Sequence, residues 1–254
     1  MTLLRDINAD HRFDAETSAK ALLSLYKAAP AEKVIKAALE TFGGRFAIVS
    51  SFGAESAVLL HLVSTVSKDI PVLFLDTGKL FPETIAYRDQ LVNLLGLTDV
   101  RILSPDDQDL AVHDPNGTLW QGQTNQCCYI RKVVPLDKAL KGFDAWASGR
   151  KRYQNSAREQ LEHFEAGDNR VKVNPLAHWT KNDIATYMEL LELPQNPLVE
   201  QGYLSIGCAP CTDKVQDGED DRAGRWRASA KTECGIHLNK QENAAIASMD
   251  GASL

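Results

Sequence analysis

The sequence predicts an α/β protein: an open, mostly parallel sheet flanked by helices, followed by a loop-rich C-terminal tail. From Arg45 onward, short apolar runs alternate with helical stretches, which is typical of parallel strands joined by helices. The runs are continuously apolar, as expected of strands buried on both faces. A chain of 254 residues, 44% hydrophobic and 24% charged, is long enough for a sizeable core, and this composition excludes disorder, collagen and coiled coil.

The elements are expected in the following order. Two amphipathic helices, over Asp14 to Ala28 and Ala31 to Thr41, open the chain. Pro30 precedes the second helix and Gly43-Gly44 follow it, which is typical of helix ends. Strands are then expected over 45–50, 71–76, 99–103, 143–148 and 171–173, and helices over 54–66 and 82–95.

We expect one integrated domain with three parts: a helical cap over 1–43, an α/β body over 44–195 and a C-terminal segment over 196–254. A capping pair, Thr180 and Asp183, predicts one more helix near the end of the body. The final residues are expected to be a mobile end. Open sheets bind ligands beyond the carboxyl ends of their strands, so chemistry is expected in the loops that follow the strands, after Ser50, Asp76, Leu103 and Ser148.

Composition also narrows the class of protein. The longest apolar runs, such as Ile70 to Leu75, are far shorter than the roughly 20 residues of a membrane span. The first residues are acidic where a secretory signal would be apolar, so we expect a cytoplasmic protein that does not bind membranes. A net charge of −6 argues against nucleic-acid binding, although Arg150-Lys151-Arg152 forms a local basic cluster.

The loop after the first strand, SSFGAES (50–56), predicts an anion site. It joins a strand to a helix, where free backbone N–H groups and the helix dipole favour negative charge. It matches neither GxxxxGK[ST] nor GxGxxG, so the usual NTPase and dehydrogenase interpretations lose support. A tight turn with no ligand is the alternative. LDTG (75–78) favours a nucleotide, because Asp76 and Thr77 follow the next strand at the same sheet edge.

The five cysteines divide into four plus one. Cys127-Cys128 and Cys208-x-x-Cys211 together make a set of four thiolates that suits tetrahedral zinc or a [4Fe-4S] cluster. A disulfide between neighbouring cysteines is strained. A thioredoxin-like redox pair would leave Cys127-Cys128 unexplained, and four packed core thiols are a further alternative.

Cys234 stands alone near the C-terminus, in KTECGIHL (231–238). A reactive thiolate needs cationic neighbours, and the candidates are Lys231, His237, Arg222, Arg225 and Arg227. Taken alone, an incidental surface thiol explains this residue better.

In this order, the motifs resemble the assimilatory adenylyl-sulfate reductases of the phosphoadenylyl-sulfate reductase family, in the adenine-nucleotide hydrolase-like superfamily. The resemblance runs from about Gly44 to Leu238. Its matching segments are SSFGAES, LDTGKLFPET (75–84), CCYIRKVVPL (127–136), KVNPLAHWT (172–180), NPLVEQGYLSIGCAPCT (196–212), GEDDRAGRW (218–226) and ECGIHL (233–238). The two cysteine pairs resemble the branch that carries a [4Fe-4S] cluster and usually prefers adenylyl sulfate.

The resemblance implies roles for individual residues. The phosphate loop would comprise Ser50, Ser51, Gly53 and Glu55, and the adenosine pocket would include Leu75, Asp76 and Thr77. The cluster ligands would be Cys127, Cys128, Cys208 and Cys211. Lys132 would approach both cluster and substrate, Arg222, Arg225 and His237 would lie near the phosphosulfate, and Cys234 would be the nucleophile. Many relatives have GLRRDQS where this chain has GRKRYQN (149–155); Gly149, Lys151 and Arg152 are the anion-contact candidates in that loop.

The implied reaction reduces adenylyl sulfate to sulfite and AMP, in sulfate assimilation and cysteine biosynthesis. A thiolate attacks sulfur(VI), AMP leaves, and an S-sulfocysteine forms on Cys234. No cysteine other than Cys234 remains once four bind a cluster, so a dithiol carrier such as thioredoxin or glutaredoxin must release sulfite. Whether the chain forms a homo-oligomer stays open.

Three alternatives are retained. The nearest is a reductase for the 3′-phosphorylated substrate, or one that accepts both nucleotides. An adenylating enzyme of the ATP pyrophosphatase type would normally carry an SGGxDS-like loop, from which SFGAES departs. A zinc-stabilised binding module without catalysis would use the same four cysteines.

Overall fold

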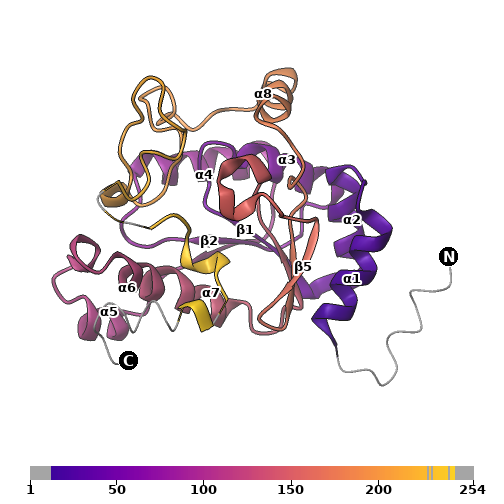
Figure 1. The fold of residues 1–254 in the computed structure, drawn as a ribbon, viewed down its shortest axis with the longest axis horizontal. Coiled ribbons are helices and arrows are strands. Elements are labelled where there is room, and N and C mark those ends of the chain that lie inside the picture. The colour runs from indigo at the N-terminus through magenta and orange to yellow at the C-terminus, as the bar shows by residue number, and fades with distance from the viewer. Residues whose placement is uncertain (1–12, 228, 230, 240, 244–254) are drawn as a thin grey trace.

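The computed structural model describes residues 13–227, 229, 231–239 and 241–243, and in it helices cover both faces of one six-stranded sheet (Figure 1). The strands are β1 (Phe46–Ser50), β2 (Val72–Leu75), β3 (Val100–Leu103), β4 (Ala145–Ala147), β5 (Phe164–Gly167) and β6 (Arg170–Val173). Their order is β3-β2-β1-β4-β6-β5, and all neighbours are parallel except β5 and β6. The predicted fold class is confirmed.

The continuously apolar strands supply two cores, one on each face of the sheet. Phe46 and Ile48 face the larger core, whereas Ala47 and Val49 face the smaller one, because successive side chains of a strand point to opposite faces. The larger core is covered by α1 (Ala15–Tyr26), α2 (Ala31–Phe42), α3 (Ser56–Val66), α4 (Pro82–Leu95) and α8 (Lys181–Leu190). On the smaller core lies α7 (Val134–Ala139), with α5 (Asp107–His113) and α6 (Thr124–Cys128) beside it (Figure 1).

Helices α5, α6 and α7 were not predicted from the sequence, and neither were two further features of the fold. β5 is joined to β6 by a hairpin in which Asp168 and Asn169 have positive φ (53° and 60°), as a tight type I′ turn requires. Between α6 and α7 lies a π-helix, Tyr129–Val133, so that Thr124 to Ala139 form one helical stretch. Pro135 cannot donate to the carbonyl of Arg131 and would clash with it in a regular helix, which accounts for the wider turn.

The helices of the predicted N-terminal cap pack on the body. The first, α1, lies on β5 and β6, and α2 lies on α3 and the sheet. At the other end, residues 231–239 of the C-terminal segment, yellow in Figure 1, place Ile236 against the smaller core and lie on the π-helix. Because strand order reverses between β1 and β4, the carboxyl ends of these two strands frame an opening of the kind in which open sheets bind ligands.

Candidate active site

A cavity of about 240 Å³ opens at the carboxyl ends of β1 and β4. Its lining comes mainly from the loop after β1, the loop after β4, the π-helix and the C-terminal segment, and the end of β2 adds Leu75. The predicted site residues that line it are Ser50, Ser51, Gly53, Glu55, Leu75, Lys132, Gly149, Lys151, Arg222, Arg225, Cys234 and His237. The fold therefore brings together residues that are distant in sequence.

The loop after β1 is strained and held by packing. Phe52 has φ of 47°, which is unusual for a bulky residue. Its buried ring packs edge-on against Phe74, 5.3 Å between centroids, and its N–H donates to Ser50 Oγ at 3.2 Å. No side chain caps the start of α3, where Glu55 is the N-cap residue. The N–H groups of Ser56 and Val58 donate to the carbonyls of Gly53 and Glu55 at 3.2 and 3.3 Å. What this helix start offers an anion is therefore mainly the positive end of the helix dipole.

Glu55 and Lys151 form an ion pair in the wall of the cavity. Lys151 Nζ lies 2.7 Å from Glu55 Oε2, and Tyr153 donates to the same carboxylate at 2.6 Å. Burial acts to raise the pKa of Glu55, but Lys151, Tyr153 and Gln154 outweigh it and the pKa is lowered. Lys151 is only 2% exposed, so its charge is directed at Glu55.

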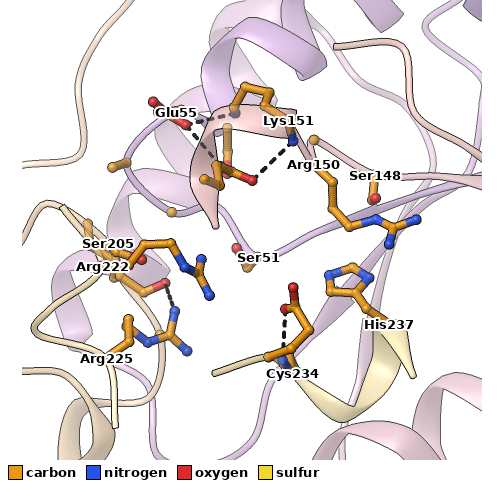
Figure 2. Close-up of a pocket in the computed structure, with 18 of the residues that line it drawn as sticks. Ser51, Glu55, Ser148, Arg150, Lys151, Ser205, Arg222, Arg225, Cys234 and His237 are labelled. Atoms are coloured by element: carbon orange, nitrogen blue, oxygen red, sulfur yellow. Dashed lines mark hydrogen bonds and ion pairs between the residues drawn. The ribbon is translucent and has the colours of Figure 1, made fainter. Parts of the chain in front are cut away.

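Three further nitrogen atoms in the cavity lack partners in the described part of the chain, two from arginines and one from His237. Burial and the nearby arginines hold the pKa of His237 well below its usual value, so its ring is neutral at pH 7. Arg150 Nε, Arg225 Nε and His237 Nδ1 are buried and have no hydrogen-bond partner among the described residues. Figure 2 shows Arg222 and Arg225 on one side of Cys234, with Arg150 and His237 on the other. Burial, together with Arg158, lowers the pKa of Arg222 to about 10, which leaves it charged at neutral pH. Donors of this kind suit a ligand rich in anionic oxygen.

Cys234 is partly buried and lines this cavity. It precedes a short 3-10 helix, Gly235–His237, whose His237 N–H donates to the Cys234 carbonyl at 3.0 Å. A Cβ on Gly235 would lie 3.0 Å from Val133 Cγ2 and 2.8 Å from Asn243 Oδ1, so only glycine allows this close approach to the π-helix. The cysteine is thus presented by a segment packed against the body.

A second, small cavity is lined by Cys127, Cys128, Cys208 and Cys211. All four thiols are free. Burial raises the pKa of Cys127 to about 11 and that of Cys128 to about 12. Burial also acts to raise the pKa of Cys208, but Lys132 outweighs it and the pKa falls.

Lys132 joins the two cavities, because it lines both, together with Arg225 and Trp226. Burial acts to lower its pKa, but the sulfur atoms of Cys208, Cys234 and Cys128 outweigh it and raise the pKa. A charged lysine between four cysteines and Cys234 is the main electrostatic link across the site.

The four cysteines of the smaller cavity are chemically suited to bind an iron-sulfur cluster. Four cysteines line one cavity, and Lys79, Arg131 and Lys132 beside them can balance the negative charge of thiolate ligands. Among the described residues, no group of three or more His, Cys, Asp and Glu side chains is arranged to hold a single metal ion. Ligands of a cluster need not meet at one ion, since each thiolate binds its own iron.

Three residues assigned to the nucleotide site do not line the larger cavity. Thr77 is fully buried, and its Oγ1 lies 3.2 Å from Cys208 Sγ. Asp76 accepts a hydrogen bond from the N–H of Gly78 at 2.9 Å. Arg152 donates to the carbonyl of Leu161 at 2.7 Å and pairs with Glu162 at 3.1 Å. The LDTG loop therefore supports the cysteines, and only Leu75 of this motif reaches the cavity.

Several residues of the site were not predicted from the sequence. Arg158 and Glu233 line the larger cavity as an ion pair at 2.7 Å. Arg131 lines the smaller cavity, pairs with Asp114 at 2.6 Å and donates to the Thr77 carbonyl at 2.8 Å. Each pair joins distant segments, so no local pattern signals it. The one signal in the sequence is the position of Glu233 beside Cys234.

Fold and site together define an α/β protein with a cavity lined by lysine and arginine side chains at the switch point of its sheet and five cysteines around one lysine. Residues 45–214 match the family model described as the phosphoadenosine phosphosulfate reductase domain. The chain belongs to this family, and the resemblance seen in its motifs is confirmed.

Among similar proteins, the adenosine 5′-phosphosulfate reductase of Mesorhizobium japonicum is 52% identical over 238 residues, covering 92% of this chain and 94% of that protein. Adenosine 5′-phosphosulfate reductase 1 of Bacillus subtilis is 42% identical over 207 residues, covering 80% and 89%. The structure of a phosphoadenylyl-sulfate reductase from Candida auris shares the fold, with a TM-score of 0.66 at 24% identity, over 78% of this chain and 96% of that one. In the described part of the chain, no helix is long and apolar enough to cross a membrane.

Proposed function

We propose that this protein reduces adenylyl sulfate to sulfite and AMP, with Cys234 as the nucleophile. The observation that carries the proposal is the common cavity at the sheet edge, where the Cys234 thiol lies among Lys132, Arg222, Arg225 and His237. The similar proteins named adenosine 5′-phosphosulfate reductase support the same substrate.

The first step is a displacement at sulfur. The Cys234 thiolate attacks the sulfur of adenylyl sulfate, a sulfur–sulfur bond forms, and the bond from sulfur to the bridging phosphate oxygen breaks. AMP leaves with the electron pair of that bond, and Cys234 carries a sulfo group. Cationic groups that surround this cysteine would stabilise the charge that develops on the departing phosphate.

The second step needs an external dithiol. One thiolate of thioredoxin or glutaredoxin attacks the Cys234 sulfur and releases sulfite, leaving a mixed disulfide. The second thiol of the carrier then restores the Cys234 thiol and leaves the carrier as a disulfide. The carrier therefore supplies both electrons. Such an exchange suits the cytoplasm, where thiols are kept reduced, and the product feeds sulfate assimilation and cysteine biosynthesis.

Cys127, Cys128, Cys208 and Cys211 would hold a [4Fe-4S] cluster. When bound, it would supply charge that orders the pocket and tunes Lys132, with no need for electron transfer, because the dithiol reduces the sulfur. Thr77 would orient Cys208 through its hydroxyl, and Arg131 would hold Thr77 in place by donating to its carbonyl. A change of cluster oxidation state during a single turnover with thioredoxin would contradict this role.

Adenosine and the phosphosulfate would divide the larger cavity between them. The start of α3 and the hydroxyls of Ser50 and Ser51 suit phosphate oxygens, and Leu75 with Gly149 leaves room for the nucleoside. The proposed contacts of Asp76, Thr77 and Arg152 with the nucleotide receive no support, since these side chains are engaged elsewhere.

Sulfite formation with two substrates tests the proposal. Anaerobically purified protein with thioredoxin is expected to form sulfite and AMP from adenylyl sulfate, with a higher kcat/KM than from the 3′-phosphorylated nucleotide. Iron and sulfide analysis of the same sample is expected to find both elements. Sulfite formation from neither nucleotide would reject the proposed activity, and stoichiometric zinc without iron would reject the cluster.

A further inference from the structure

The segment that carries Cys234 is tied to the body by a bidentate ion pair. Arg158 Nε donates to Glu233 Oε2, and Arg158 Nη2 donates to Glu233 Oε1, both at 2.7 Å. The two side chains are only 7% and 11% exposed. Bidentate, charge-assisted pairs shielded from water are the strong ones, so this contact is more than a surface salt bridge.

Arg158 is itself held in place. Its remaining terminal nitrogen, Nη1, donates to Gln154 Oε1, and Gln154 Nε2 donates to Glu55 Oε2 at 3.4 Å. Gln154 also accepts from the N–H of Lys151 at 3.1 Å. The guanidinium is thus hydrogen-bonded to the same loop that contacts Glu55, so the anchor for the cysteine segment belongs to the wall of the cavity opposite that segment.

The other partner of the ion pair, Glu233, also contacts the neighbouring Cys234. Its Oε1 accepts the backbone N–H of Cys234 at 2.8 Å, and its Oε2 accepts from Asn155 Nδ2 at 3.3 Å. One carboxylate therefore binds the body through Arg158 and Asn155 and the nucleophile through the Cys234 N–H. Withdrawal of the segment would have to break the bonds to Arg158 and Asn155 together, whereas the bond to the Cys234 N–H lies within the segment and ties the cysteine to the anchored carboxylate.

We propose that Glu233 is a positioning residue that holds Cys234 in the orientation for attack, through the Arg158–Glu233 pair. This inference rests on the proposed function of Cys234. Glu233 does not need to touch the substrate. It sets the place of the thiol relative to the cationic groups of the cavity.

The negative charge of Glu233 allows its positioning role to be distinguished from a general contribution to the fold. Glu233 is an anion in a cavity that also holds Arg150, Arg158 and Arg222, and its removal makes the cavity more cationic. Glu233→Gln should therefore keep or strengthen the binding of AMP while it slows the reaction of Cys234. A variant with a disrupted fold would instead lose both AMP binding and the reaction of Cys234.

The test compares Glu233→Gln with Glu242→Gln in the full-length protein. Glu242 is an exposed residue of the same segment whose carboxylate accepts the N–H of Asn239 at 2.7 Å, so its loss leaves the ion pair intact. Hydrogen exchange without substrate is measured first. We expect exchange of peptide 232–238 to become about tenfold faster in Glu233→Gln and to stay unchanged in Glu242→Gln, since charge-assisted bonds are the strong ones.

Rapid-quench mass spectrometry at saturating adenylyl sulfate without reductant then measures sulfo transfer to Cys234. We expect it to be at least about tenfold slower in Glu233→Gln, with AMP affinity equal to or tighter than that of the wild type. Unchanged exchange and unchanged transfer would overturn the inference, and so would parallel loss of transfer and AMP binding. If the wild type forms no adduct, the proposed function fails, whereas the exchange result still tests the ion pair.

Discussion

The two walls of the larger cavity differ in how their charged side chains are paired. In the wall built by the sheet, Glu55 binds Lys151 and Tyr153, and the ion pair is closed within the protein. In the wall built by the C-terminal part of the chain, Arg225 Nε and His237 Nδ1 have no partner among the described residues. Arg150 of the sheet wall also has an unpartnered Nε, and Glu233 of the C-terminal wall is paired with Arg158, so the contrast is clearest between Glu55 and Arg225. It indicates that the sheet wall is preformed, whereas Arg225 near Cys234 retains a donor for an anion.

Lys132 belongs to neither wall alone, and its replacement gives the largest expected effect. Lys132→Gln should lower kcat/KM for sulfite formation by about 10²- to 10³-fold, as loss of one preorganised electrostatic group typically does. Lys138→Gln is the matched control, since Lys138 is exposed and weakly paired at 3.8 Å with Asp106 and Asp109. Iron content and AMP affinity should be measured on both variants. Near-normal turnover in Lys132→Gln would show that this lysine does not act on the reacting sulfur.

The closed ion pair of the sheet wall should matter for stability. Glu55→Gln leaves the buried charge of Lys151 without its anionic partner. We therefore expect the free energy of unfolding to fall by about 3 kcal/mol at pH 7, as for other broken buried ion pairs. Because folding lowers the pKa of Glu55, its carboxylate stabilises fully above its unfolded value of 4.5 and progressively less as pH falls below that. The difference from wild type should be constant from about pH 6 to 8 and shrink in acid. Urea titrations across this range test it, and a difference that grows in acid would contradict the assignment.

A pair of arginine variants gives the smallest and most selective contrast. Arg222→Gln should weaken AMP binding by about tenfold, since charge-assisted bonds to phosphate are strong. Arg152→Gln should change it by no more than about twofold, because Arg152 lies outside the cavity and pairs with Glu162. Isothermal titration with AMP measures both. Equal losses would mean that Arg152 reaches the phosphate after a rearrangement of its loop.

The same contrast explains what could be predicted from the sequence. The strands of the sheet wall are continuous apolar runs, and the loop after Ser50 follows its strand directly, so both were within reach of local patterns. The cysteine set was recognisable from spacing. By contrast, the contact of Thr77 with Cys208 depends on how the LDTG loop meets the C-terminal segment, which spacing does not reveal.

The remaining differences have similar causes. Arg158 and Glu233 are 75 positions apart, and each alone is an ordinary charged loop residue. The π-helix arises from Pro135 within a helical stretch, where a simple rule predicts a break. In the basic loop at 149–155, Lys151 and Arg152 were candidates for anion contact, whereas in the structure Lys151 binds Glu55 and Arg152 binds Glu162.

Covalent modification of Cys234 tests the central claim most directly. The wild-type protein, mixed anaerobically with adenylyl sulfate and no reductant, is digested and its peptides are analysed by mass spectrometry, beside a Cys234→Ser variant. We expect a sulfo group on Cys234, release of AMP, and release of sulfite only after thioredoxin is added, with no adduct in the variant. Sulfite formed while Cys234 stays unmodified would contradict the covalent route and the catalytic role of the C-terminal wall.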